Sequence, residues 1–221
     1  MKLKNPKLIL LLASTLLSPI AYSYEISPYS WDNSTPITWG IMSASDSCLQ
    51  GGALEPCQDM NDFMPAGFLG EVERAFDAWS SVANIQFAFT ADISQAMIRM
   101  GGVDIDGPSN VLAYSYYPTN PAPSSFAGDV FFDWGESWTI GTAGIDIFWT
   151  ALHEIGHTIG IEHSTIANTI MYAYYNPSVT GLTADDIAAA QAIYGPSPVP
   201  VPAAFWLFAS GLLFFNRRKI A

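Results

Sequence analysis

Residues 153–164, which read HEIGHTIGIEHS, decide the fold of this chain. Residues four apart on a helix leave the same face one turn apart, so His153 and His157 can bind one metal ion together. This separation suits two ligands of a tetrahedral zinc site. Glu154 lies beside the first histidine, where its carboxylate can take a proton from a water molecule that the metal activates.

The end of the same stretch supplies a third ligand. Gly160 is placed to end the helix, because glycine accepts the left-handed backbone of a sharp turn. That turn can bring His163 to the metal and leave the fourth position open. The chain has three histidines, and all of them lie here. Two helical histidines are often only surface residues, but that reading leaves the glycine and the third histidine unexplained.

The stretch resembles the signature of the metzincin zinc peptidases, H-E-x-x-H-x-x-G-x-x-H followed by a methionine turn. Ser164, directly after the third histidine, is similar to the matrixin branch, and Met171 would be the methionine of that turn. A methionine there would give the imidazoles a soft apolar floor. The resemblance extends from Pro36 to Gly195. It implies an α+β fold with a twisted, mostly parallel five-stranded sheet and three main helices.

The start of the chain has the composition of an export signal. Lysines at positions 2, 4 and 7 precede an apolar run over 8–17, and small residues follow at Ala21 and Ser23. This order is typical of a secretory signal peptide. The alternative, a cytosolic protein with an apolar N-terminus, does not explain why charged, apolar and small residues follow one another in this order. We therefore predict a signal peptide at 1–23 and a peptidase domain at 24–195.

The last segment, 196–221, also differs from the middle of the chain. A proline-rich spacer over 196–202 precedes an apolar run over 203–215 and the basic end RRK. The run is short for an independent membrane span, which needs roughly 20 residues. The segment resembles the PEP-CTERM-type sorting tails of Gram-negative bacteria, which are held in the membrane and cut by an exosortase. A plain C-terminal anchor is the alternative. The resemblance implies a secreted or cell-surface protein that meets the membrane only through this tail.

Between the two ends the chain is strongly acidic. Arg74 and Arg99 are the only basic residues between Tyr24 and Pro196, against all 20 acidic residues, so this part carries a net charge of −18. Such a charge argues against nucleic acid and anionic membrane surfaces as partners. Cys48 and Cys57 also lie here, and a disulfide between them is the default in an exported chain.

Hydrophobic periodicity predicts the elements of the domain. Apolar and polar residues alternate in the β-rich segments. In other segments the apolar residues have the spacing of one helix face, which predicts helices that pack on a sheet. Between the first strand and the first helix, residues 43–61 are polar and contain glycine, which predicts an irregular insertion that holds the cysteines. The predicted strands are 36–41, 85–90, 96–100 and an edge strand at 111–117, and the predicted helices are 70–81, 144–159 and 187–194, the last after a capping-box-like start at Thr183.

The resemblance also implies where substrate binds. In matrixins the strand that corresponds to 111–117 holds extended substrate at the sheet edge, a mode with general physical logic. It points to Ala113 and Tyr114 as substrate-binding residues. Tyr175 matches a tyrosine of the loop that lines the matrixin S1′ pocket, where Ala173 replaces the usual proline. The alternative is an ordinary edge strand covered by a loop.

Residues 128–139 resemble a matrixin segment that binds calcium. The resemblance implies that Asp106, Asp133 and Glu136 are calcium ligands, and hard carboxylates are the ligands that Ca²⁺ prefers. The alternative is that they are surface acids in loops. Tyr114 and Phe131 stand where matrixins carry histidines of a second, structural zinc. We therefore expect one zinc, with aromatic packing in the vacated space.

The resemblance implies a secreted zinc endopeptidase that acts on protein or peptide substrates. Zinc on His153, His157 and His163 would polarise the scissile carbonyl, and Glu154 would pass a proton from water to the leaving amine. One alternative is a non-proteolytic metal-binding surface or matrix protein that keeps the fold, although a purely structural zinc has no need of Glu154. The other is a zinc hydrolase that acts on a non-peptide bond.

Overall fold

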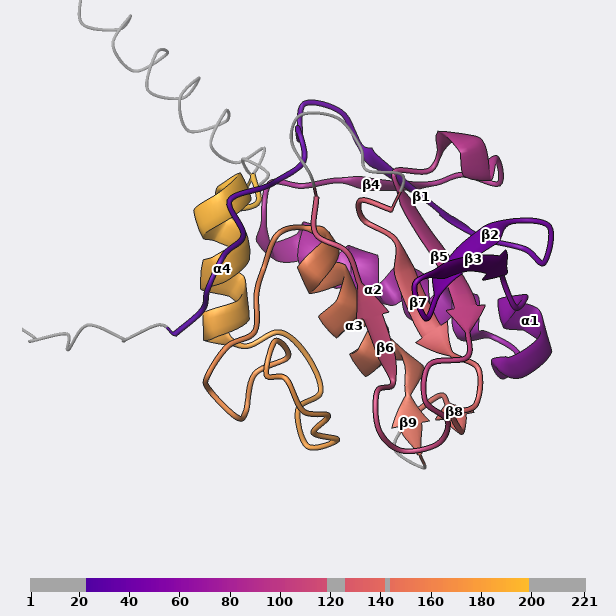
Figure 1. Cartoon of the computed structure of the whole chain (residues 1–221). Coiled ribbons are helices and arrows are strands. Elements are labelled where there is room, and N and C mark those ends of the chain that lie inside the picture. The colour runs from indigo at the N-terminus through magenta and orange to yellow at the C-terminus, as the bar shows by residue number, and fades with distance from the viewer. Residues whose placement is uncertain (1–22, 119–125, 142–143, 199–221) are drawn as a thin grey trace, which may run out of the picture.

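A computed structural model describes residues 23–118, 126–141 and 144–198 (Figure 1). The predicted signal peptide, apart from its last residue, and the predicted tail from residue 199 onward lie outside the described residues. Within the ranges described, no helix combines the length and the apolar character that crossing a membrane requires.

A five-stranded sheet forms the centre of the domain, in the order β4-β1-β5-β7-β6. The first four of these strands are parallel, and β6 pairs with β7 in the antiparallel direction at one edge. The expected mostly parallel α+β sheet is therefore confirmed. The edge strand is shorter than predicted. The strands are β1 (Ile37–Ile41), β4 (Phe87–Phe89), β5 (Ile98–Val103), β6 (Ala113–Ser115) and β7 (Val130–Asp133).

Two long helices, α2 (Phe68–Val82) and α3 (Ile147–Thr158), pack against each other in the main core. The indole Nε1 of Trp79 on α2 donates a hydrogen bond to the Leu152 carbonyl on α3, at 3.0 Å. All twelve residues of α3 are buried, so this helix is fixed along its whole length. The third helix, α4 (Ala184–Tyr194), follows near the end of the described chain (Figure 1).

The predicted irregular insertion at 43–61 is wrong, because most of it is ordered. Strands β2 (Ser47–Gln50) and β3 (Ala53–Pro56) form an antiparallel hairpin, and the short helix α1 (Met60–Phe63) follows. The turn Gly51-Gly52 has φ values of 56° and 88°, the left-handed backbone that a two-residue hairpin turn requires. The glycine pair was the sequence signal for this hairpin.

The hairpin lies over the sheet face away from the helices. Cys48 and Cys57 are joined by a disulfide, and both side chains are buried in a second apolar cluster with Phe131 of β7. The neighbouring residues Val130 and Phe132 belong instead to the helix-side core, as strand alternation requires. The sheet is therefore covered on both faces.

Aromatic rings pack at the two positions where a second zinc would need histidines. The Tyr114 and Phe131 ring centroids lie 5.3 Å apart, and the Tyr114 hydroxyl donates a hydrogen bond to the Leu49 carbonyl of the hairpin. Phe131 is fully buried. The hairpin and these rings together fill this part of the molecule with apolar side chains.

The start of α3 differs from the prediction. Residues 145 and 146 form β9 (Ile145–Asp146), which pairs with β8 (Trp138–Thr139), and the helix begins at Ile147 rather than at 144. The Asp146 side chain caps the helix, because its Oδ1 accepts the Trp149 backbone N–H at 2.8 Å. A short 3₁₀ helix, η1 (Ile93–Gln95), completes the described elements.

Candidate metal centre

Three imidazoles converge at the C-terminal end of α3. The Nε2 atoms of His153 and His157 lie 3.2 Å apart, and those of His157 and His163 lie 3.1 Å apart. Two nitrogens bound to one tetrahedral zinc at 2.0–2.1 Å are about 3.3 Å apart, so the spacing fits zinc. Among the described residues, this is the one group of three or more His, Cys, Asp or Glu side chains whose ligand atoms come within 4.8 Å of one another.

Hydrogen bonds on the far side of two rings aim their free nitrogens at the common point. Nδ1 of His153 donates to the Ile170 carbonyl and Nδ1 of His157 donates to the Ile161 carbonyl, each at 2.7 Å. A carbonyl only accepts, so the proton is on Nδ1 and the lone pair is on Nε2. Burial lowers the pKa of both histidines to about 4, so both are neutral at physiological pH, as metal ligands must be.

The turn at Gly160 ends the helix and places both the third histidine and a supporting carbonyl. Gly160 N–H donates to the His157 carbonyl and Ile161 N–H donates to the Gly156 carbonyl, both at 2.9 Å. These are the two bonds of a Schellman motif, with Gly160 at φ 94°. The same turn presents the Ile161 carbonyl to His157 and directs the chain toward His163.

Met171 packs beneath the metal centre. Met171 is buried, with 1% of its surface exposed. Its sulfur occupies the space beside Gly156 that a Cβ would need, so a larger residue at 156 would collide with it. The Asp186 carboxylate on α4 accepts the backbone N–H groups of Ile170 and Met171, at 3.1 and 3.0 Å. Nothing in the local sequence showed that Asp186 anchors the methionine turn.

Glu154 lies beside the histidines with 5% of its surface exposed. Burial raises the pKa of its carboxyl group, and the nearby His157 and a hydrogen bond from Ser115 act in the opposite direction. The Ser115 hydroxyl donates to Glu154 Oε2 at 2.7 Å. No local pattern indicated this contact, since the two residues are 39 positions apart.

One cleft of about 680 Å³ contains all three histidines and Glu154. Ala113, Tyr114 and Tyr175 also line it, so the structure brings the predicted substrate-binding residues to the same cleft. Trp149 lines the cleft as well. Its ring stacks on His153 with centroids 5.5 Å apart, and Tyr175 meets it edge-on at 4.8 Å.

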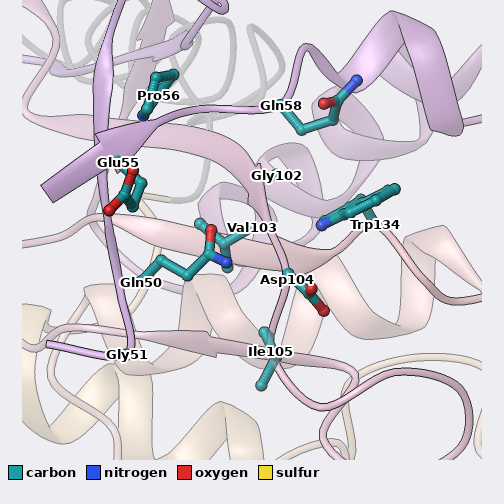
Figure 2. A pocket seen from close by; sticks show the side chains of 10 residues that line it. All are labelled: Gln50, Gly51, Glu55, Pro56, Gln58, Gly102, Val103, Asp104, Ile105 and Trp134. Carbon is teal, nitrogen blue, oxygen red and sulfur yellow. The ribbon is translucent and has the colours of Figure 1, made fainter. Parts of the chain in front are cut away.

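A second hollow, of about 560 Å³, lies between the β2–β3 hairpin and the end of β5 (Figure 2). Its wall includes Glu55, Asp104 and Trp134, and it holds no histidine and none of the predicted site residues. The metal chemistry therefore belongs to the cleft beside α3.

The three predicted calcium ligands tie together the segment after β5, which contains Asp106, and the end of β7, where Asp133 and Glu136 lie. Asp133 is fully buried, and its Oδ2 accepts the backbone N–H groups of Asp106 and Gly107, at 3.2 and 3.1 Å. Glu136 Oε1 accepts the Ser109 N–H at 2.6 Å. Ser109 has φ 83°, a strained backbone for a serine. The three carboxylates do not form a compact ligand group as the three histidines do.

Comparison with known proteins agrees with this geometry. The sequence matches the family model described as Matrixin over residues 57–195. It is 32% identical to the hatching enzyme of Paracentrotus lividus over 188 residues, which cover 80% of this chain and 28% of that protein. It is 36% identical to karilysin of Tannerella forsythia over 132 residues, and 37% identical to stromelysin-1 of Equus caballus over 139 residues. These alignments cover 56% and 58% of this chain, and 28% of each relative.

The chain spans less than a third of the length of each of these relatives, so the alignments concern one domain of them. Matrixins use a catalytic zinc and structural calcium, and the group of His153, His157 and His163 fits the zinc site. The family match covers more than half of the chain and includes all three histidines and Glu154. On this match and this geometry, the chain belongs to the matrixin family.

Proposed function

We propose that the chain is a zinc-dependent endopeptidase. The observation that carries the proposal is the convergence of three histidine Nε2 atoms and one buried carboxylate in a single open cleft. Zinc bound there would supply a Lewis acid that polarises a substrate carbonyl and acidifies a water molecule. His153, His157 and His163 would hold the ion, and hydrogen bonds at Nδ1 already orient the rings of the first two.

Glu154 carries the proton transfers in this proposal. Its carboxylate lies at the cleft beside two ligand histidines, within reach of a water molecule there. It would accept the proton of the attacking water and deliver it to the leaving nitrogen. Burial raises its pKa, which brings the carboxyl group closer to the operating pH and makes both transfers easier.

The cleft walls would hold an extended polypeptide. Strand β6 is at the sheet edge and, within the described part of the chain, pairs only with β7, so its outer main-chain groups can pair with a substrate strand. Trp149 and Tyr175 give an aromatic wall next to His153, which suits an apolar substrate side chain. The Tyr175 hydroxyl donates to the Gly144 carbonyl at 3.2 Å and accepts the Asp146 N–H at 3.0 Å, which fixes this wall to the start of α3.

A quenched fluorescent peptide library tests the activity. We expect the 24–195 domain to cleave it, chelator to abolish cleavage, and added zinc to restore it. Glu154→Gln keeps the shape of the side chain but removes the base, so it should bind zinc normally and lose at least about a thousandfold in kcat. A protein that binds zinc tightly but cleaves nothing would instead be the non-proteolytic surface or matrix protein.

We further propose one zinc per chain and a calcium ion at Asp106, Asp133 and Glu136. Metal analysis that found two zinc ions would contradict the first part. For the second part, calcium should raise the melting temperature of the wild type, and Asp133→Ala should abolish this rise. Asp104→Ala removes an exposed acid from the same region and is the matched control. In this variant calcium should still raise the melting temperature.

We also propose that the protein is exported and sorted by its tail. The support is the sequence pattern of residues 1–23 and 196–221, and the similarity of the domain to karilysin of Tannerella forsythia. An exosortase-like peptidase of a Gram-negative cell would then be a partner. Mass spectrometry of the protein from such cells should show a mature N-terminus at Tyr24 and loss of the basic end, whereas a plain anchor would keep it.

A further inference from the structure

A hydroxyl group on the edge strand contacts the buried carboxylate of the active site. Ser115, the last residue of β6, places its Oγ 2.7 Å from Glu154 Oε2 and 3.1 Å from the Glu154 carbonyl oxygen. A serine has one hydroxyl proton, so the shorter contact to the ionised group is the principal hydrogen bond. Among the described residues, Ser115 is the only hydrogen-bond donor to that carboxylate.

This contact decides which way the carboxylate faces. A glutamate side chain rotates about three bonds, and Glu154 lies in a cleft wall with 5% exposure, where few other polar groups can fix it. A charge-assisted hydrogen bond is roughly twice as strong as a neutral one, so the Ser115 hydroxyl can fix the position of Glu154 Oε2. The second oxygen, Oε1, is then the one left for a water molecule in the cleft.

We propose that Ser115 is a positioning residue for Glu154. The inference rests on the proposed peptidase function and adds to it. The contact joins β6 to α3, and β6 is also the strand whose free edge would bind substrate. One strand therefore aligns both the substrate backbone and the carboxylate that moves the proton. Nothing in the sequence around Ser115 marks it for this role, because its partner comes from a distant helix.

The test compares Ser115→Ala with Ser115→Thr, which keeps the hydroxyl group. Ser115 is only partly buried, so the added methyl group has room. Losing a hydrogen bond to a charged group should lower kcat about ten- to thirtyfold in Ser115→Ala, with KM within about twofold of wild type. Ser115→Thr should keep kcat within about threefold. Melting temperature and zinc content should match wild type in both.

The matched control is Ser94→Ala. The Ser94 hydroxyl also donates to a carboxylate at 2.7 Å, that of Asp92, but on the exposed 3₁₀ helix far along the sheet from the cleft. It should leave kcat unchanged. The proposal is overturned if Ser115→Ala keeps wild-type kcat, if it changes KM alone, or if Ser115→Thr loses as much kcat as alanine does.

These outcomes separate this inference from the proposed function. If the wild-type domain shows no chelator-sensitive cleavage, the peptidase proposal itself fails. If the wild type cleaves and Glu154→Gln does not, while Ser115→Ala cleaves normally, only the role of Ser115 is refuted.

Discussion

Replacing Gly160 with alanine tests whether the turn after α3 is required for the geometry of the metal site. Gly160 has φ 94°, and a Cβ there would lie 2.6 Å from the Tyr29 carbonyl oxygen. The colliding atom belongs to the backbone, so a side-chain rotation cannot relieve the collision. The segment that carries Tyr29 would have to move away from the turn.

The cost has two parts. A left-handed backbone costs a non-glycine residue about 1 kcal/mol. Moving the N-terminal segment also endangers the hydrogen bonds from Ser27 N–H to the Gly160 carbonyl, at 2.8 Å, and from Glu162 N–H to the Glu25 carbonyl, at 2.9 Å. Each is worth about 1 kcal/mol. We therefore expect Gly160→Ala to lower the free energy of unfolding by about 3 kcal/mol, and to weaken zinc binding because His163 follows the turn.

Two other glycines separate the causes in urea unfolding. Gly51 in the β2–β3 turn has φ 56° but open space around its Cβ position, so Gly51→Ala should cost only about 1 kcal/mol. Gly70 in α2 has neither a positive φ nor a neighbour, so Gly70→Ala should be neutral or stabilising by about 0.5 kcal/mol. Zinc affinity is measured for each variant by chelator competition.

Equal losses in Gly160→Ala and Gly51→Ala would show that the contact with Tyr29 is relieved at no cost, which refutes the steric part of the reasoning. Unchanged zinc affinity in a destabilised Gly160→Ala would refute the link between this turn and the position of His163.

Three further perturbations follow from contacts elsewhere in the domain. Asp186→Ala removes the acceptor of two backbone amides in the methionine turn, so unfolding free energy should fall by about 3 kcal/mol and zinc should be released faster, as stopped-flow chelation would show. Replacing Cys48 and Cys57 together by alanine should cost about 2.5 kcal/mol in urea unfolding, from the closure entropy of a loop with separation 9, without loss of zinc. Burial raises the pKa of Asp129 to about 6, although Asp129 forms an ion pair with Arg99. Protonated Asp129 therefore stabilises the folded state fully below pH 3.8, and this stabilisation is lost as the pH rises through about 6. The stability advantage of wild type over Asp129→Asn should therefore shrink by about 3 kcal/mol from about pH 3.5 to about pH 7.

Several features could be predicted because they depend on neighbours in the chain. A helix places residues 153 and 157 on one face whatever surrounds it, and a glycine at 160 permits the turn that follows. Four of the five sheet strands were predicted, although their ends were not, and β7 at Val130–Asp133 was not predicted as a strand. The hairpin at 47–56 was also a local feature, marked by Gly51-Gly52, and the sequence reading overlooked it.

Other features depend on which elements pack together. The sequence determined that His153 and His157 share one face of a helix with Glu154 beside the first of them, because helix geometry fixes those relations within about one turn. Only the tertiary structure decided that Ser115 faces Glu154, that Asp186 holds the methionine turn, and that the disulfide hairpin packs on Phe131. These partners lie far apart in sequence, and they meet because burying the two faces of one sheet brings distant segments together.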